Sequence, residues 1–405
     1  MDEVTVGARL RTLRRWRGMT QAEVAGLAGL SPSFLSMVEQ GTRMLDRRSQ
    51  IAGVASALRV SETDLVGGPH LSQDRLQSDP HMGIPPLRIA LQTNTLTSSA
   101  VDRARPVSEL HQIVFGQLEP MRRNCDYLGM GRVLPDVLDE LHYHVAEPAD
   151  EADQRLALEA LVEACATAAV LAKGLGYVDL GQFAAQRSRD VASFLDDPVQ
   201  KGKADFWWLL TLPHVGSWDR NLAAAERCAN DLEPHARDAL SKQVLGMITL
   251  TASMSAAAVQ RGDRAVHWLD EASWLATQVP DDPALAWESF SAVNVGIWRV
   301  AIGVERGESG GGVLELAKEV NLDLFESKSA RRAGLMLDVG RGLAREPRSR
   351  ADAVGWLRRA EHAAPQLVRN NAAARETVAY LLNRANAAAG GRELRGMAAR
   401  MGVPH

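Results

Sequence analysis

The sequence has few cysteines, and their positions limit what they can do. Cys125, Cys165 and Cys228 are the only ones among 405 residues, and no two of them form a Cys-x-x-Cys pair. An odd number of widely spaced cysteines excludes a disulfide framework and lacks the usual ligand spacing of a structural zinc site. We therefore expect reduced, mostly buried thiols and no bound metal.

Long hydrophobic runs are also missing. A helix that crosses a membrane needs about 18 consecutive apolar residues, and no stretch of the sequence approaches this length. The first residues, Met1-Asp2-Glu3-Val4, have neither the basic end nor the apolar block of a secretory signal. Both absences predict a cytoplasmic protein that has no membrane partner.

The chain as a whole lacks an excess of positive charge. It has 46 basic and 50 acidic residues and a net charge of −4 at pH 7, which argues against a general attraction to nucleic acid. Residues 1–67 differ, because they hold nine arginines and no lysine against seven acidic residues. A nucleic-acid partner would therefore be bound locally, by this N-terminal part.

Recognisable catalytic motifs are absent as well. The sequence contains no glycine-rich phosphate loop, no metalloprotease histidine pair, no nucleophile elbow and no set of kinase motifs. Scattered serine, histidine and aspartate residues are too common to indicate an enzyme. We expect no cofactor, no catalytic residues and no enzymatic activity.

Helix-breaking residues concentrate between two parts of the chain. The segment 66–106 contains Gly67-Gly68-Pro69, Asp79-Pro80 and Pro85-Pro86, and only Leu87–Leu91 could form a short helical turn. We therefore divide the chain into an N-terminal domain (1–67), a linker or hinge (68–104) and a C-terminal domain (105–405).

The C-terminal domain is expected to be entirely helical. Its long windows rich in alanine and leucine show almost no period-two alternation. The window Asp219–Cys228 aligns with Asp263–Ala272, 44 residues later, and again with Ala351–Ala360. About 44 residues suffice for two antiparallel helices and their turns, so the pattern predicts helical hairpins stacked into a solenoid with a concave face. The windows resemble the second helix of tetratricopeptide (TPR) repeats.

The strongest functional pattern lies near the N-terminus. Thr20 and Glu23 have the spacing of a capping box, which begins a helix, and Gly29 permits the sharp turn that ends it. Ser31-Pro32 then begins a second short helix. Two short helices joined by a glycine turn form a helix-turn-helix.

These helices, preceded by Val6-Gly7-x-Arg9-Leu10-Arg11-x-Leu13-Arg14 and followed by Ile51-Ala52-x-x-Ala55-x-Ala57-Leu58, resemble the Cro/C1-type (XRE) helix-turn-helix family. The resemblance covers about residues 4–66. It implies a five-helix DNA-binding domain in which Arg14 pairs with Glu39 and ties the first helix to the recognition helix. The chain departs from the family pattern in lacking a proline after Gly41.

The resemblance also implies which residues meet double-stranded DNA. Gln21 would contact the DNA backbone and a base edge, and the start of the recognition helix would face the major groove. Short polar side chains read base edges, while arginines hold phosphates. The residues expected to contact DNA are Gln21, Ser31, Ser33, Phe34, Ser36, Met37, Arg43 and Arg47.

The C-terminal part has weaker signals. The segments Val368–Asn371, Leu381–Ala385 and Gly390–Ala398, together with Asn294–Ala301, are similar to actinobacterial regulators that join an XRE domain to a TPR-like region. These motifs are less specific than the helix-turn-helix, and they do not indicate what is sensed.

One stripe of residues is a candidate ligand site. The spacing i, i+4, i+7 and i+11 predicts one face of a helix from about Ala284 to Val304. Polar groups between two aromatic rings suit a groove for a small molecule or a peptide, but core packing with Asn294 hydrogen-bonded to a neighbouring helix is the favoured interpretation of the stripe. The four residues are Trp287, Ser291, Asn294 and Trp298.

The sequence therefore predicts a sequence-specific DNA-binding regulator. A single domain covers one half-site, so we expect a homodimer whose C-terminal domain senses a small-molecule or peptide effector. One alternative is a constitutive regulator whose helical repeats serve only dimerisation or protein docking. Another is an enzyme or toxin-associated protein with an autoregulatory DNA-binding head.

Overall fold

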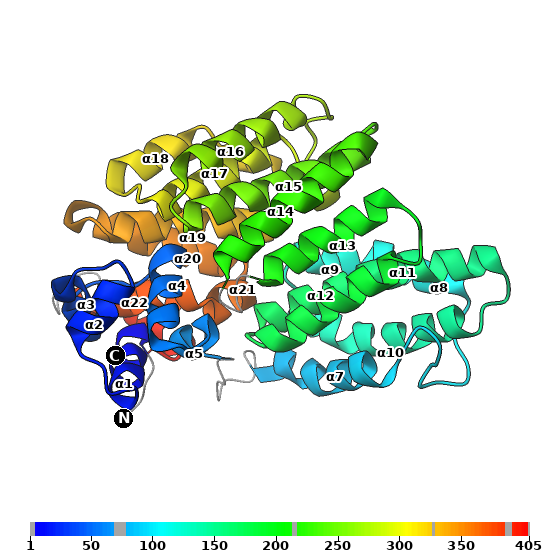
Figure 1. Ribbon diagram of the computed structural model, residues 1–405, viewed down its shortest axis with the longest axis horizontal. Coiled ribbons are helices and arrows are strands. Elements are labelled where there is room, and N and C mark those ends of the chain that lie inside the picture. The colour runs from blue at the N-terminus through cyan, green and yellow to red at the C-terminus, as the bar shows by residue number, and fades with distance from the viewer. Residues whose placement is uncertain (1–4, 69–77, 213–216, 326–328, 385–390, 404–405) are drawn as a thin grey trace.

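The computed structural model describes residues 5–68, 78–212, 217–325, 329–384 and 391–403. The described residues form helices, with one isolated bridge between Thr95 and Ser98 and no sheet. The prediction of an all-helical fold, with a small N-terminal domain followed by a large helical region, is confirmed (Figure 1).

The N-terminal domain, called the head below, has five helices and its own hydrophobic core. The core side chains include Leu10, Val24, Leu35, Leu58 and Leu65, all nearly inaccessible to solvent. The helices are α1 (Val6–Trp16), α2 (Gln21–Leu27), α3 (Pro32–Glu39), α4 (Arg48–Leu58) and α5 (Glu62–Val66).

Local sequence sets the ends of α2 and α3. Thr20 Oγ1 accepts a hydrogen bond from the Glu23 amide at 3.2 Å, and Glu23 Oε2 accepts one from the Thr20 amide at 2.7 Å. Ser31 Oγ accepts from the Phe34 amide at 3.1 Å and begins α3. Gly29, with φ +67°, turns the chain between the two helices. Both caps and the glycine turn follow the sequence prediction.

The C-terminal region consists of helices of very different length. They are η1 (Asp79–Gly83), α7 (Ile84–Thr93), α8 (Val107–Ile113), η2 (Val114–Leu118), α9 (Glu119–Arg123), α10 (Tyr127–Ala146), α11 (Glu151–Gly174), α12 (Val178–Ala192), α13 (Pro198–Thr211), α14 (Trp218–Leu232), η4 (Glu233–His235), α15 (Ala239–Ala258), α16 (Gly262–Ala276), η5 (Trp287–Ser289), α17 (Ala292–Arg306), α18 (Gly310–Lys318), η6 (Leu322–Leu324), α19 (Ala330–Ala344), η7 (Pro347–Ser349), α20 (Arg350–Ala363), α21 (Pro365–Asn370), α22 (Ala372–Arg384) and α23 (Gly391–Arg400).

Most of these helices alternate between two layers. Helices α11, α13, α15, α17 and α19 each pack against the next and form a first layer. Helices α12, α14, α16, α18 and α20 each pack against a member of the first layer and form a second one (Figure 1). Stacked helical hairpins are therefore present, as the repeat predicted. The likeness to TPR repeats stays a prediction.

The repeat windows fall at equivalent places in this stack. Asp219, Asp263 and Ala351 are the second residues of α14, α16 and α20, all in the second layer. A further repeat, 44 residues after Asp263, would begin near residue 307. Helix α18 occupies this place and has only nine residues. The sequence period thus corresponds to one pair of helices, one from each layer.

The segment 68–104, expected to be a linker, contains a helix of ten residues where the sequence indicated at most a short turn at Leu87–Leu91. Helix α7 places Ile84, Leu87 and Leu91 in the hydrophobic core of the C-terminal region and packs against α10. Pro85-Pro86 lies in its first turn. There the missing amide hydrogens cost nothing, so this proline pair begins a helix instead of breaking one.

The single helix expected from Ala284 to Val304 is also wrong. Helix α17 begins only at Ala292, and the preceding residues form the short turn η5. Glu288 takes φ +47° there, which ends regular helix. Ser291 Oγ accepts from the Asn294 amide at 3.3 Å, so Ser291 is the N-cap of α17 and not part of its face.

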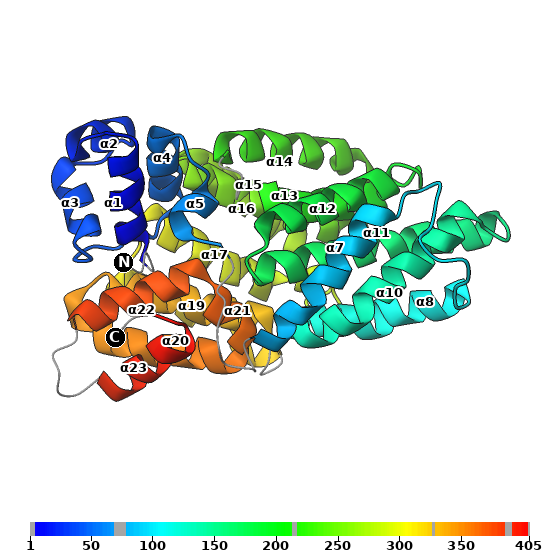
Figure 2. The same ribbon diagram turned by 90° about the horizontal axis from the view of Figure 1, so that it is seen from below.

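The head lies against the first layer. In Figure 2 it is seen beside α22 and α14. The Val6 amide donates to Glu376 Oε2 of α22 at 3.2 Å, and Arg48 lies over the Trp218 ring of α14 at 5.8 Å from its centroid. Among the described residues, no helix is long and apolar enough to span a membrane.

Candidate nucleic-acid interface

A buried ion pair joins the first helix of the head to the end of α3. Arg14 Nε and Nη2 donate to the two carboxylate oxygens of Glu39 at 2.6 and 2.9 Å, the geometry expected from the sequence. Burial alone would raise the pKa of Glu39, but the hydrogen bonds and charge of Arg14 hold it below its ordinary value. Glu39 is therefore ionised and fixes the position of α3 relative to α1.

Gln21 belongs to the same cluster. Its Nε2 donates to Glu39 Oε2 at 2.8 Å, so one amide hydrogen is used within the head. The carbonyl oxygen and the second hydrogen are the groups that can meet a base edge, and a glutamine amide matches the donor and acceptor pattern of adenine. The Glu39 carboxylate thus orients a residue expected to read DNA.

Helix α3 presents a face of three polar side chains and one methionine at one end of the molecule. Ser33, Ser36, Met37 and Gln40 recur at i, i+3, i+4 and i+7 and share this face. Figures 1 and 2 both show α2 and α3 at this end, remote from α10 and α11. The N-terminus of α3, where a recognition helix meets the groove, is open to an external partner.

The expected contact residues differ in exposure. Ser31 and Ser33 are exposed, while Ser36 and Met37 are half-buried and Phe34 packs its ring partly against the head core. Ser36 Oγ also accepts from Gln40 Nε2 at 3.2 Å. The free hydroxyl of Ser33 is therefore the most accessible group of this set.

The two arginines expected to hold phosphates are oriented differently. Arg43 is exposed. Arg47 lies against the C-terminal region, where a Cβ atom added to Gly307 would fall 2.7 Å from its Nη2. Its neighbour Arg48 pairs with Glu305 at 3.2 Å. In this arrangement Arg43 is available to DNA, and Arg47 does not take the expected phosphate position.

Sequence reasoning missed the residues that hold the loop before α4. Arg345 Nη2 pairs with Asp46 Oδ2 at 2.8 Å, and Arg341 Nη2 donates to the Asp46 carbonyl at 2.7 Å. Arg384 donates to the carbonyl of Thr42. The loop that lacks the family's proline is therefore held by the C-terminal region. No local pattern marks such pairs, because about 300 residues separate the partners.

The expected ligand stripe does not form one face. Asn294 is completely buried, and its Nδ2 donates to Met247 Sδ of α15 at 3.6 Å and to the Glu288 carbonyl at 3.3 Å, which corresponds to the core-packing alternative. Trp287 is buried on η5 and Ser291 caps α17. Of the four residues, Trp298 lines a cavity between the head and the C-terminal region. Within the described ranges, no group of three or more His, Cys, Asp or Glu side chains is placed to hold a metal ion.

Comparison with known proteins identifies the head. Residues 5–66 match the family model described as a helix-turn-helix domain, so the head is a helix-turn-helix domain. The HTH-type transcriptional regulator RamB of Mycobacterium tuberculosis, from strains CDC 1551 / Oshkosh and ATCC 25618 / H37Rv, is 32% identical over 95 residues. This alignment covers 22% of the chain and 20% of RamB, so the chain spans about a fifth of the length of these relatives.

One solved structure is also similar. The crystal structure of Bacillus thuringiensis PlcR in complex with the peptide PapR7 and DNA covers 68% of this chain and 95% of the PlcR chain. The sequence identity is 12% and the TM-score is 0.26.

Proposed function

We propose that the protein is a sequence-specific DNA-binding transcriptional regulator of the Cro/C1 type that acts in the cytoplasm and has no catalytic role. The observation that carries this proposal is the exposed start of α3, held in place by the partly buried cluster of Arg14, Gln21 and Glu39. The match of residues 5–66 to a helix-turn-helix model and the similarity to RamB support it.

The proposed DNA-bound form is a homodimer. One head covers one half-site, and a head with a small net charge gains little affinity from phosphates alone, so two linked heads are needed for tight binding. The C-terminal region would join the two chains and set the distance between their heads. Analytical ultracentrifugation of the full chain, alone and with DNA, tests this: two chains per duplex are expected, and one chain per duplex contradicts it.

The proposal includes a response to a small-molecule or peptide effector through the C-terminal region. The contacts of Asp46, Arg48 and Glu376 across the boundary support it, because a ligand that alters these contacts alters the position of the head. A constitutive regulator would have the same DNA-binding surface without this coupling.

The direct test is selection of DNA sequences by the full chain from a random pool. We expect enrichment of an operator made of two related half-sites, followed by saturable binding at physiological salt. Enrichment of no sequence, with only salt-sensitive binding to any duplex, would contradict the proposed sequence-specific function.

A further inference from the structure

A cavity of about 430 Å³ lies between the head and the first layer of the C-terminal region. Its walls come from α11, α13, α15, α17, α19 and α22, and from the start of α14. The head closes it with residues of α1, α4 and α5. A molecule inside this cavity would contact the DNA-binding head and the helical repeats at the same time.

Several polar atoms of the cavity lining are buried without a hydrogen-bond partner among the described residues. Two are acceptors, Glu62 Oε1 and Asn221 Oδ1, and two are indole donors, Trp218 Nε1 and Trp298 Nε1. The Trp218 indole lies near the Glu62 carboxyl group and lowers its pKa, so Asn221 and Trp298 are the more isolated pair. Proteins rarely leave buried polar atoms unpaired, so such a cluster around a cavity indicates a missing ligand or ordered water.

Most charged groups of the lining are already paired. Asp338 pairs with Arg341 at 2.7 Å, and Asp46 and Arg48 are paired as described above. Within the described residues, no cation lies within ion-pair distance of Glu62 or Glu376. Each of these carboxyl groups is more than nine-tenths buried.

The unpaired charges favour a cationic ligand over an anionic one. Burial raises the pKa of Glu62 to about 7 and that of Glu376 to about 7, and the nearby charges of Arg48 and Arg9 offset this only in part. Lys173 is the one unpaired cation of the lining, and its Nζ already donates to the Leu210 carbonyl at 2.8 Å. Glu62 Oε1 and the amide oxygen of Asn221 thus lack donors, whereas Glu376 already accepts from the Val6 amide.

We propose that this cavity binds a small, largely apolar molecule that carries a primary amine. Its ammonium group donates to Glu62, with Glu376 as the second carboxylate of the same cavity, and its apolar part packs against Ile297, Trp298 and Leu337. An ammonium group offers three donors and a positive charge, which match the unpaired acceptors, and indole rings favour a nearby cation.

Such a ligand would stabilise the docked head, because it contacts both walls only when the head closes the cavity. This regulatory meaning rests on the proposed function. Binding of the amine itself does not depend on it.

The test uses calorimetric titration of the full chain with three probes of equal length: 4-phenylbutylamine, 4-phenylbutanol and 4-phenylbutanoate. We expect the amine to bind at least about tenfold more tightly than the other two, because a buried ion pair is formed only by the amine. Tighter binding of the alcohol or the carboxylate, or no binding of the amine, overturns the proposal.

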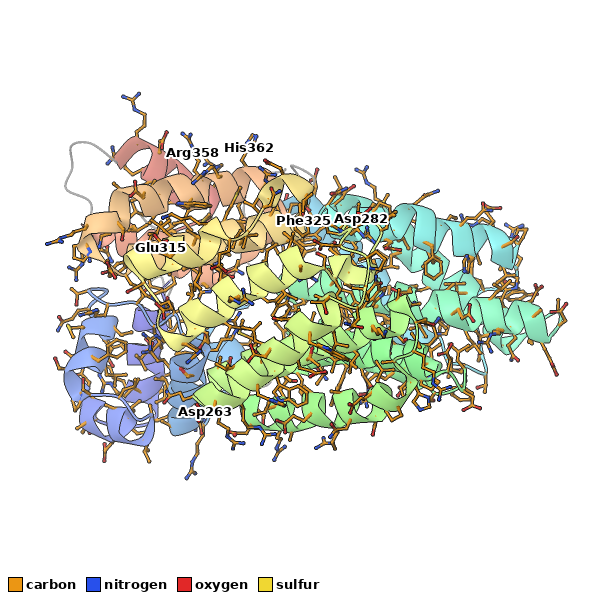
Figure 3. All side chains as sticks on the ribbon, turned by 90° about the horizontal axis from the view of Figure 1, so that it is seen from above. Asp263, Asp282, Glu315, Phe325, Arg358 and His362 are labelled. Carbon is orange, nitrogen blue, oxygen red and sulfur yellow. The ribbon has the colours of Figure 1, made fainter. Side chains whose placement is uncertain are left out.

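Matched variants locate the site. Glu62→Gln should weaken the amine about tenfold and leave the alcohol unchanged, while Glu315→Gln should change neither, because Glu315 projects from α18 at the surface (Figure 3). Equal effects of the two variants overturn the assignment of Glu62.

A second pair of variants tests the cavity without removing a charge. Gly334 of α19 lines the cavity, and a Cβ atom there meets nothing within 4 Å. Gly334→Leu should fill the space and abolish binding of both amine and alcohol. Gly355→Leu, on α20 with equally open space, should leave both unchanged. Both substitutions replace a helical glycine, so their effects on helix propensity match. If Gly334→Leu binds the amine and the alcohol as tightly as the wild type does, the proposed location of the ligand in this cavity is wrong.

Fluorescence anisotropy with the selected operator separates this inference from the proposed function. If the full chain binds no operator, the proposed function fails while calorimetry still decides the amine site. If the amine binds but operator affinity stays within twofold, the regulatory coupling is wrong.

Discussion

Glu39 connects the first three helices of the head. It is 6% exposed and accepts hydrogen bonds from Arg14 and Gln21. Arg11 adds a third link by donating to the Glu39 backbone carbonyl at the end of α3. One carboxylate therefore aligns α1, α2 and α3, and the DNA-reading surface depends on a group that need not touch DNA.

Arg14→Ala should destabilise the head, because it leaves the Glu39 carboxylate buried without its main partner. Removing one partner of a buried pair costs about 3–5 kcal/mol, and Arg14 is itself only 13% exposed. Hydrogen exchange of the full chain should show faster exchange throughout α1 and α3. The control is Arg15→Ala, whose side chain is exposed. Equal exchange in the two variants would refute this role.

Ser33→Ala should weaken operator binding without changing the melting temperature. The Ser33 hydroxyl is exposed at the start of α3, and a base contact of this kind contributes about 1–3 kcal/mol when well formed. Ser56→Ala, on an exposed position of α4, is the matched control. Anisotropy titration and thermal unfolding measure both effects, and an affinity equal to that of Ser56→Ala would show that α3 does not read the operator through Ser33.

Glu62 should make the stability depend on pH. Its pKa is raised from an ordinary 4.5 to about 7, so the folded state disfavours the ionised carboxylate. Glu62 adds its full contribution to the free energy of unfolding below pH 4.5, where its carboxyl group is protonated. This contribution is lost as the pH rises to 7 and the carboxyl group ionises. The shift corresponds to about 3 kcal/mol.

Urea unfolding of wild type and Glu62→Gln at several pH values measures this contribution. The variant should gain stability relative to wild type as the pH rises from 4.5 to 7.5, because it cannot ionise. Glu315→Gln provides the baseline, since Glu315 is exposed and paired with Lys318 at the surface. A difference between Glu62→Gln and wild type that is constant over this range would be inconsistent with the buried, unpaired carboxyl group.

Among the helices, α7 shows how a proline pair can begin an element. Its buried residues make it part of the C-terminal region and not part of a linker.

Leu87→Ala should therefore destabilise the C-terminal region by about 2–5 kcal/mol, the range for a fully buried leucine. Ile89→Ala removes a similar side chain from the same helix at a position that is 61% exposed, and should change stability by less than about 0.5 kcal/mol. Chemical denaturation compares them. Equal, small effects would mean that α7 does not belong to the core.

At the scale of the whole molecule, polar contacts join the head to the repeats. The ion pairs of Asp46 with Arg345 and of Arg48 with Glu305 lie beside the cavity between the head and the repeats, and Glu376 accepts from the Val6 amide. Because Asp46, Arg345 and Glu305 are largely buried, removing one partner of either pair is costly, so the position of the head is sensitive to any change that separates them.

Arg345→Ala should loosen this docking, because Arg345 also donates to the Val304 carbonyl at 2.7 Å. We expect faster hydrogen exchange in α4 and a larger radius of gyration by small-angle X-ray scattering. Arg348→Ala, on an exposed arginine three residues away, is the control. A compact Arg345→Ala chain with unchanged exchange would mean that the head is held by other contacts.

The sequence by itself determined what depends on neighbours along the chain. The caps at Thr20 and Ser31 and the turn at Gly29 follow from residues within a few positions of each other, so they were predictable. The all-helical class and the 44-residue repeat follow from hydrophobic periodicity in the same way. The pairing of Arg14 with Glu39 was implied by a family resemblance, because the two lie 25 residues apart.

Only the tertiary structure decided what depends on distant segments. It turned Arg47 toward Gly307, placed Trp298 but not Trp287 at the cavity, and brought Glu62 beside the repeats. Neither helix period nor capping chemistry carries information about which surfaces meet, because docking depends on shape and charge summed over segments hundreds of residues apart. The cavity between head and repeats therefore has no signature in the sequence.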